Sequence, residues 1–267
     1  MQLSFNPFKA ALAERRAQYG IWAGFAHPYA AEIVASTGYD WLLLDGEHAP
    51  NTVPTLLAQL QALAPYATHP VVRIVKGDAT LVKQVLDIGA QTLMVPMIET
   101  AEQALEMVRA MRYPPFGIRG VGGGLTRATR WDDVPDYIRT AQEQLCLIVQ
   151  VESRRGVENV AEIAAVDGVD AVFIGPADLS TGMGHAGDAS QAEVQAAIRH
   201  AIDETRKAGK ASGILAPAEP DARRYAQWGC SFIAVGIDIS LLRQAARANL
   251  ACYRSIERGA QHPAGPY

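Results

Sequence analysis

The chain has 267 residues, of which 49% are hydrophobic and 19% charged, so it is long enough for one large domain with a buried core. Its formal net charge is −4 and its arginines are scattered, which argues against a nucleic-acid-binding surface. No apolar run approaches the ~18 residues of a membrane span, and charged residues near the N-terminus argue against a signal peptide.

A lead-in helix is expected over residues 6–18, with Gly20 closing the segment. After it the sequence repeats one unit: a short apolar strand, a loop, and an amphipathic helix that ends at glycine. The strands that we predict are Ile21–Ala26, Trp41–Leu44, Val71–Val75, Thr92–Pro96, Leu145–Val151, Ala171–Ile174, Ala211–Leu215 and Phe232–Val235. About eight such units predict a parallel sheet closed into a (β/α)₈ TIM barrel. An open doubly wound sheet is the alternative, but no G-x-G-x-x-G follows the first strand.

We expect residues 1–258 to form this single barrel domain. The last helix, over residues 240–258, either closes its own barrel or packs on another subunit. Residues 259–267 are rich in proline and glycine and are expected to be a disordered tail. The three cysteines (Cys146, Cys230 and Cys252) lack C-x-x-C spacing, which is typical of reduced thiols in a cytoplasmic protein.

Two acidic residues, Glu152 and Asp178, each follow a short β-branched run and precede helix-starting residues. We expect both at the C-terminal rim of the barrel, where barrel enzymes have their active sites. Two carboxylates without a neighbouring Cys or His suit a hard divalent cation such as Mg²⁺ or Mn²⁺. The structural alternative is that both acids cap the helices that follow, although Glu is a poor N-cap.

Residues 44–48, Leu-Asp-Gly-Glu-His, bring three ionisable side chains to the same rim. His48 is a candidate general base, and the alternative is a structural histidine bonded to a neighbouring carboxylate. Arg73 interrupts an apolar strand, so it needs an anionic partner. That partner is either a structural acid or a substrate oxygen that becomes negative.

Asp87 lies in the last turn of a predicted helix, where the dipole disfavours an acid, so we expect a local partner such as a cation or an imidazole N–H. An aspartate buried against His48 would hold the tautomer of the ring, and an exposed aspartate is the alternative. Lys76 is a less favoured candidate for a Schiff base, because a turn follows it and a metal route is simpler. Gly122–Gly124 is a weak candidate for a phosphate site.

With these residues in hand, the chain resembles the 4-hydroxy-2-oxoheptanedioate aldolase family of metal-dependent class II pyruvate aldolases. The motifs that carry the resemblance are Tyr39-Asp-Trp-Leu-Leu-Leu-Asp-Gly-Glu-His-Ala-Pro50, Val95-Pro-Met97, Tyr113-Pro-Pro-Phe-Gly-Ile-Arg-Gly-Val121, Val149-Gln-Val-Glu152 and Phe173-Ile-Gly-Pro-Ala-Asp-Leu-Ser180. The resemblance implies a (β/α)₈ fold of the phosphoenolpyruvate/pyruvate superfamily, usually hexameric. It also implies reversible cleavage of a 4-hydroxy-2-oxo acid to pyruvate and an aldehyde.

The resemblance also implies roles for individual residues. Glu152 and Asp178 match the ligands of a divalent cation (Mg²⁺, Mn²⁺ or Co²⁺), and His48 matches the base. The remaining matches are Arg73 as the group that stabilises the enolate, Asp45 and Asp87 as acids that orient or tune the histidine, and Gln150, Ala177, Asp178, Trp22 and Leu215 as contacts of the substrate.

A glycine-rich loop, Pro114 to Arg130, carries Arg119, Arg127 and Arg130 beside apolar residues, a composition that suits an interface. In the resembling family this segment reaches toward the barrel mouth of a neighbouring subunit. The loop and residues 74–77 depart from the pattern expected of diacid-cleaving members. This leaves the aldehyde open, and the donor is either pyruvate or hydroxypyruvate.

Two other functions are kept as alternatives. A barrel lyase for acyl-CoA esters, such as citramalyl-CoA or malyl-CoA, would share the two-acid metal site. It would also need a groove for a long anionic cofactor, and no extra basic segment provides one. A non-catalytic binding protein would not need His48, Arg73, Glu152 and Asp178 together.

Overall fold

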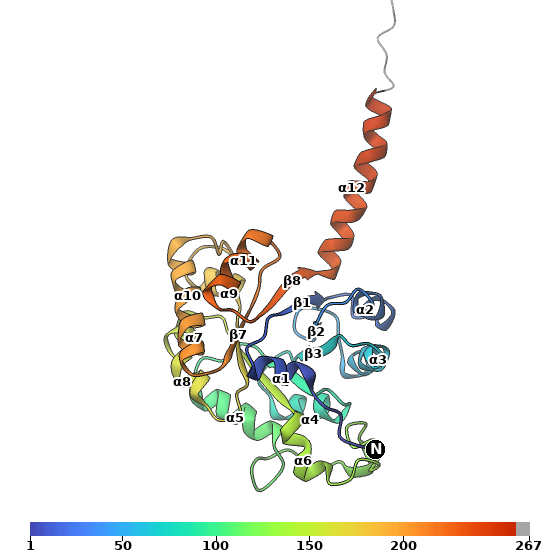
Figure 1. The fold of residues 1–267 in the computed structure, drawn as a ribbon, viewed down its shortest axis with the longest axis vertical. Helices are drawn as coiled ribbons and strands as arrows, with labels where there is room; N and C mark the ends of the chain where they lie inside the picture. The colour runs from blue at the N-terminus through green and yellow to red at the C-terminus, as the bar shows by residue number, and fades with distance from the viewer. Residues whose placement is uncertain (260–267) are drawn as a thin grey trace, which may run out of the picture.

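Eight parallel strands close into a barrel in the computed structural model, which describes residues 1–259 (Figure 1). The strands are β1 (Gln18–Ala23), β2 (Trp41–Asp45), β3 (His69–Arg73), β4 (Thr92–Val95), β5 (Cys146–Val151), β6 (Ala171–Ile174), β7 (Ala211–Leu215) and β8 (Phe232–Ile237). Each strand pairs with the next in the chain, and β8 pairs with β1. The predicted (β/α)₈ barrel is therefore confirmed.

Helices alternate with these strands and lie outside the barrel. They are α1 (Pro7–Ala13), α2 (Pro28–Ala35), α3 (Val53–Leu63), α4 (Ala79–Asp87), α5 (Ala101–Met111), α6 (Tyr137–Gln144), α7 (Arg154–Glu158), α8 (Val160–Ala165), α9 (Pro176–Gly182), α10 (Ala192–Lys207), α11 (Glu219–Trp228) and α12 (Asp238–Gly259), with a short 3₁₀ turn, η1 (Gly123–Leu125). The tail expected over residues 259–267 lies, from residue 260 on, outside the described residues. The domain boundary at residue 258 stays a prediction.

Alternation along the strands produces two apolar cores. The larger core lies between the barrel and its helices. The smaller one fills the barrel interior, where side chains from alternate strand positions meet; its aromatic members are Phe8, Trp22, Trp41, Phe173 and Phe232. Phe8 comes from α1, so the lead-in helix closes the N-terminal end of the barrel. The interior is a packed core and not a channel.

The first strand begins earlier than its sequence predicts. The lead-in helix ends at Ala13, and Gly20, which the sequence suggested as the end of that helix, lies within β1. A Cβ at Gly20 would come within 2.1 Å of the indole of Trp41. The glycine is therefore needed for packing across the interior, and the polar Gln18 pairs with Phe232 because β1 must meet β8.

The last helix, α12, projects away from the barrel (Figure 1). Residues 239–254 are all exposed, including Leu242, Leu250 and Tyr253. Because α12 projects away, it does not close its own barrel, and packing on another subunit is the arrangement that remains a prediction. The apolar side of α12 consequently has no partner within the part of the chain that the structure describes.

The N-terminal end of the barrel buries a histidine. His69 begins β3, its Nε2 lies 2.8 Å from Thr92 Oγ1, and its ring stacks on Phe8 with centroids 5.6 Å apart. Asn6 donates to the same hydroxyl at 3.0 Å. Burial lowers the pKa of His69 from 6.5 to about 4, so the folded protein keeps this imidazole neutral.

This burial predicts a pH-dependent stability. Between pH 6.5 and about 4 the unfolded chain binds a proton at His69 that the folded chain does not, so stability falls as the pH falls through this window. From pH 7.5 to 5.0 the loss from this one group is about 2 kcal/mol. Urea denaturation of His69→Gln at both pH values should show a smaller loss than the parent protein by about this amount.

His200→Gln is the matched control, because His200 is exposed on α10. Protein concentration must be the same throughout, since assembly would also shift the midpoint. An equal pH dependence in His69→Gln and in the parent would contradict the assignment.

Candidate active site at the C-terminal rim

A cavity of about 320 Å³ opens at the C-terminal ends of the strands. Its walls combine ionisable side chains with a large apolar surface. The lining residues are Trp22, Gly24, Asp45, His48, Ala49, Arg73, Gln150, Phe173, Gly175, Pro176, Ala177, Asp178, Leu215, Ile237 and Ile239. All the substrate contacts expected from the sequence (Gln150, Ala177, Asp178, Arg73, Leu215 and Trp22) therefore line one cavity.

Arg73 is buried at this rim and held by two carboxylates. The register of β2 and β3 sets Asp45 beside Arg73, whose Nε and Nη2 donate to Asp45 at 2.9 and 2.7 Å. Its Nη1 lies 2.8 Å from Glu47 Oε2. The guanidinium also lies over the indole of Trp22, 5.0 Å from the centroid. Arg73 thus has structural acid partners and still borders the cavity.

The two acids that hold Arg73, Asp45 and Glu47, have pKa values that shift in opposite directions. Burial raises the pKa of Asp45, but the hydrogen bonds and charge of Arg73 outweigh burial and bring that pKa below its ordinary value. Trp22 Nε1 and the backbone N–H groups of Glu47 and His48 also donate to Asp45. For Glu47, burial is the largest effect, and its pKa is raised.

Glu152 is buried directly after β5. Its Oε1 accepts the backbone N–H of Met97 at 2.9 Å, and Gln150 Nε2 donates to its Oε2. Met97 has a left-handed backbone, with φ +55°, which is unusual for a residue with a side chain. Burial raises the pKa of Glu152 to about 7, the Met97 N–H opposes this, and the nearby Asp178 and Glu47 add to it.

Asp178 differs from its expected position at a strand end. It lies in the first turn of α9, four residues after β6, and is exposed in the cavity wall. The N-caps of α7 and α9 are Ser153 and Gly175, so neither Glu152 nor Asp178 is an N-cap. This excludes N-capping by the two acids, although Asp178 does lie in the first turn of α9, where a helix favours a negative charge.

The charges around the cavity favour a divalent cation. Asp45, Glu47, Glu152 and Asp178 surround a single cationic residue, Arg73, which leaves an excess of negative charge. Gln150 Oε1 is buried without a hydrogen-bond partner among the described residues. No cluster of three or more Asp, Glu, His or Cys able to hold a metal occurs in residues 1–259. An oxygen-only donor set with open positions suits Mg²⁺, Mn²⁺ or Co²⁺ and leaves room for a substrate.

His48 lies at the edge of the cavity with 67% of its side chain exposed. Its Nε2 is 3.9 Å from Glu47 Oε2. Asp87 is not beside it: the acid ends α4 and so lies at the opposite end of the barrel, where Arg119 donates to it at 2.8 Å. Within one chain, Asp45 and Arg73 therefore line the same cavity as His48, whereas Asp87 does not.

The two weaker candidates from the sequence, Lys76 and the glycine run, do not belong to this cavity. Lys76 is exposed after β3 and does not line the cavity, and Gly123 and Gly124 belong to η1, far along the chain from any strand end. Glu47 stands next to His48 in the sequence, but no local pattern predicts its ion pair with Arg73. The sequence predicts Phe173 only as a strand residue, and in the structure it also forms part of the apolar wall of the cavity.

The sequence matches the HpcH/HpaI aldolase/citrate lyase family over residues 18–245. The chain belongs to this family. A hydroxypyruvate/pyruvate aldolase of Delftia acidovorans is 78% identical over 96% of this chain and 96% of its own. A 4-hydroxy-2-oxo-heptane-1,7-dioate aldolase of Klebsiella pneumoniae is 56% identical over 91% and 92%. The protein is therefore a carbon–carbon lyase of the aldolase type, as its motifs predict.

Solved structures agree with this membership. An HpcH/HpaI aldolase/citrate lyase family protein from Burkholderia cenocepacia superposes with a TM-score of 0.90, at 42% identity and over 93% of this chain and 99% of the other. The citrate lyase β subunit of Mycobacterium tuberculosis reaches a TM-score of 0.57 at 20% identity, over 89% and 98%, and shares the fold alone. Members of the aldolase family generally depend on a divalent metal. No described helix is long and apolar enough to cross a membrane.

Gly175 provides a test of the site. A Cβ at this position would lie 2.4 Å from Glu152 Oε2 and 2.9 Å from Gln150 Nε2. We expect Gly175→Ala to push the carboxylate aside and weaken Mn²⁺ binding about tenfold or more, as loss of a supporting contact does at other metal sites. Titration calorimetry with Mn²⁺ measures this directly.

Gly182→Ala is the matched control, since it ends the same helix and an added Cβ there meets nothing within 4 Å. It should change the Mn²⁺ affinity by less than about twofold, within the scatter of surface substitutions. Unaltered affinity in Gly175→Ala would show that Glu152 can move without consequence.

Proposed function

We propose that the protein cleaves 4-hydroxy-2-oxo acids reversibly to an aldehyde and pyruvate or hydroxypyruvate. The names of its relatives support pyruvate or hydroxypyruvate as the keto acid. The cavity supports it too, because its single buried cation, Arg73, suits the negative charge of a small keto acid. The apolar wall formed by Trp22, Phe173 and Leu215 provides the surface for an aldehyde. A panel of aldehydes, each tested with pyruvate and with hydroxypyruvate, identifies both partners.

In the cleavage direction the bond between C3 and C4 of the substrate breaks. Its electron pair stays on C3 and becomes the enolate of the keto acid, while the C4 hydroxyl loses its proton and becomes the aldehyde carbonyl. Arg73 stabilises the negative charge that develops on the keto oxygen. Asp45 and Glu47 hold the guanidinium in place beforehand, so the charge meets an oriented donor.

His48 accepts the proton of the C4 hydroxyl. Its position at the cavity edge and its exposed ring support this role, because the imidazole has access to a substrate that enters from solvent. General bases of this kind contribute about 10²–10⁴-fold to the rate. Protonation of the enolate carbon then releases the keto acid.

Glu152 and Asp178 would hold the divalent cation, and Gln150 would orient Glu152 through its amide. When bound, the cation supplies a Lewis acid for the keto oxygen. An acyl-CoA lyase remains the alternative activity. It is disfavoured because the citrate lyase relative is distant and the cavity is lined mainly by apolar residues.

Metal removal and two kinds of variant test this proposal. We expect a chelator to abolish activity and Mg²⁺, Mn²⁺ or Co²⁺ to restore it. Glu152→Ala and Asp178→Ala should lose Mn²⁺ binding, whereas His48→Ala should bind Mn²⁺ normally and lose about 10²–10⁴-fold in kcat. Calorimetry and release of keto acid are measured on the same samples.

A metal-free enzyme that keeps full activity and is inactivated by borohydride would overturn the proposal and favour Lys76. Parental turnover by His48→Ala would remove the histidine from the role of base.

We also propose that the active form is a homo-oligomer, which the resemblance gives as a hexamer. The exposed apolar side of α12 supports a contact with a second copy. The segment from residue 116 to 131 exposes further apolar groups, notably Val121, Leu125 and Trp131. The buried free thiols Cys146 and Cys230 support a cytoplasmic location.

Assembly offers a role for Asp87. In one chain it is remote from His48 but tied by Arg119 and by Ala128 N–H to the loop that we propose to reach a neighbour. We infer that Asp87 orients His48 of the adjacent copy, so that each site takes residues from two chains. An aspartate beside the imidazole would fix its tautomer and raise its basicity.

Mixed oligomers test this inference. His48→Ala and Asp87→Ala are each expected to be nearly inactive, yet co-expression should restore about a quarter of the parental activity, because random mixing joins native His48 to native Asp87 at about that share of sites. Turnover per site is measured on affinity-selected mixed assemblies. Activity no higher than that of the two separate variants would contradict a site shared between chains.

A further inference from the structure

A second pocket lies at the N-terminal end of the barrel, opposite the active-site cavity. Four segments form it: the N-terminal residues Leu3 and Ser4, the turn 89–91 before β4, the loop 127–134, and α6. Its volume is about 60 Å³. A single water needs roughly 10–15 Å³ by this measure, so the pocket has room for a small molecule.

The pocket contains two half-buried arginines, Arg127 and Arg130. Arg127 donates to the carbonyl of Ile88 at 3.0 Å, and no ion pair joins either arginine to an acid among the side chains that the structure describes, those of residues 1–254. Burial and the charge of Arg130 lower the pKa of Arg127. Two like charges are thus held together without a carboxylate to offset them.

The backbone that carries this pair is itself unusual. Arg130, Trp131 and Asp132 follow one another with φ of +51°, +57° and +72°. Left-handed conformations are unfavourable for residues with side chains, and three in succession require support from the surroundings. Hydrogen bonds within the loop provide this support: Arg130 N–H donates to the carbonyl of Arg127 at 3.0 Å, and Asp132 N–H donates to Thr129 Oγ1 at 3.1 Å.

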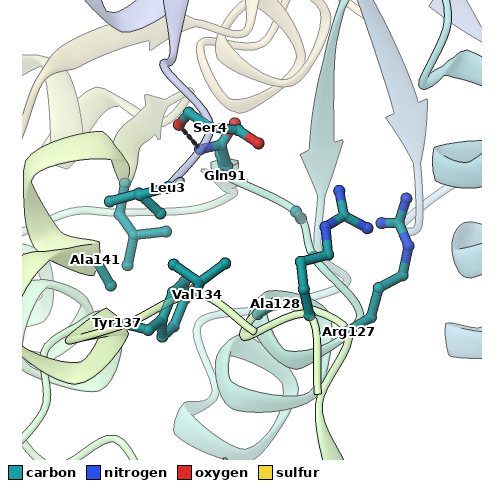
Figure 2. Close-up of a pocket in the computed structure, with 12 residues that line it drawn as sticks. Leu3, Ser4, Gln91, Arg127, Ala128, Val134, Tyr137 and Ala141 are labelled. Atoms are coloured by element: carbon teal, nitrogen blue, oxygen red, sulfur yellow. Dashed lines mark hydrogen bonds between the residues drawn. The ribbon is translucent and has the colours of Figure 1, made fainter. Parts of the chain in front are cut away.

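The opposite wall is apolar. Figure 2 shows Leu3, Val134, Tyr137 and Ala141 gathered on one side of the pocket, with Arg127 on the other. Guanidinium groups bind carboxylate and phosphate oxygens through paired hydrogen bonds. We propose that this pocket binds a small oxyanion, either a phosphate or a short-chain carboxylate whose apolar end contacts the wall.

Calorimetric titration of the full-length protein with inorganic phosphate and, separately, with propionate tests the proposal. We expect at least one of them to bind with a dissociation constant in the millimolar range or below. Arg127→Gln and Arg130→Gln should each weaken that binding about tenfold or more, the loss expected for a charged hydrogen bond. Binding of propionate identifies a carboxylate ligand, and binding of phosphate alone identifies a phosphate ligand.

Arg139→Gln is the matched control, because it removes an equal charge from exposed α6 nearby. It should leave the affinity within about twofold. Absence of binding by the parent protein would overturn the proposal, and so would equal binding by both pocket variants, which would place the anion elsewhere. Smaller assemblies of both variants in sedimentation, without anion binding by the parent, would assign the arginines to a subunit contact.

Discussion

One buried cation among several acids determines the arrangement of the active-site rim. Arg73 is held by Asp45 and Glu47, and the charge of Asp178 lies close enough to Glu152 to contribute to the raised pKa of that carboxyl. Removing one member of a buried ion pair commonly costs about 3–5 kcal/mol, so the ion pairs of Arg73 with Asp45 and Glu47 are a structural requirement apart from the catalytic role that we propose for Arg73. The remaining negative charge suits a divalent cation, and Arg73 together with such a cation would offset the charge of an anionic substrate.

Much of this arrangement could be predicted from the sequence, because the signals are local. Apolar runs ending in acids predict strands whose ends meet at one rim, and this places Asp45, Arg73 and Glu152 together. The boundary between the first helix and β1 could not be predicted in the same way. Gly20 resembles a helix end in the sequence, but it lies in β1, where its missing side chain accommodates the distant Trp41. A cation beside Asp87 could be predicted from its position at a helix end, but its identity as Arg119 could not, since that pair joins a loop to the helix through long-range packing.

Two features of the single chain are exposed in the part that the structure describes. The apolar side of α12 is exposed, and the His48 ring lies at the open edge of its cavity. The exposed apolar side of α12 is a surface that a soluble protein ordinarily covers. The glycine-rich loop exposes apolar side chains too, and these surfaces support the assembly that we propose.

The aromatic layer inside the barrel has a further consequence. Phe8, Trp41 and Phe232 pack against one another and fill the interior between the two ends. Water, protons and ligands therefore cannot pass along the barrel axis. The arginine pocket and the catalytic cavity of one chain therefore lie at opposite ends of a closed core, and an influence of one on the other within that chain would travel through the strands and the helices packed around them.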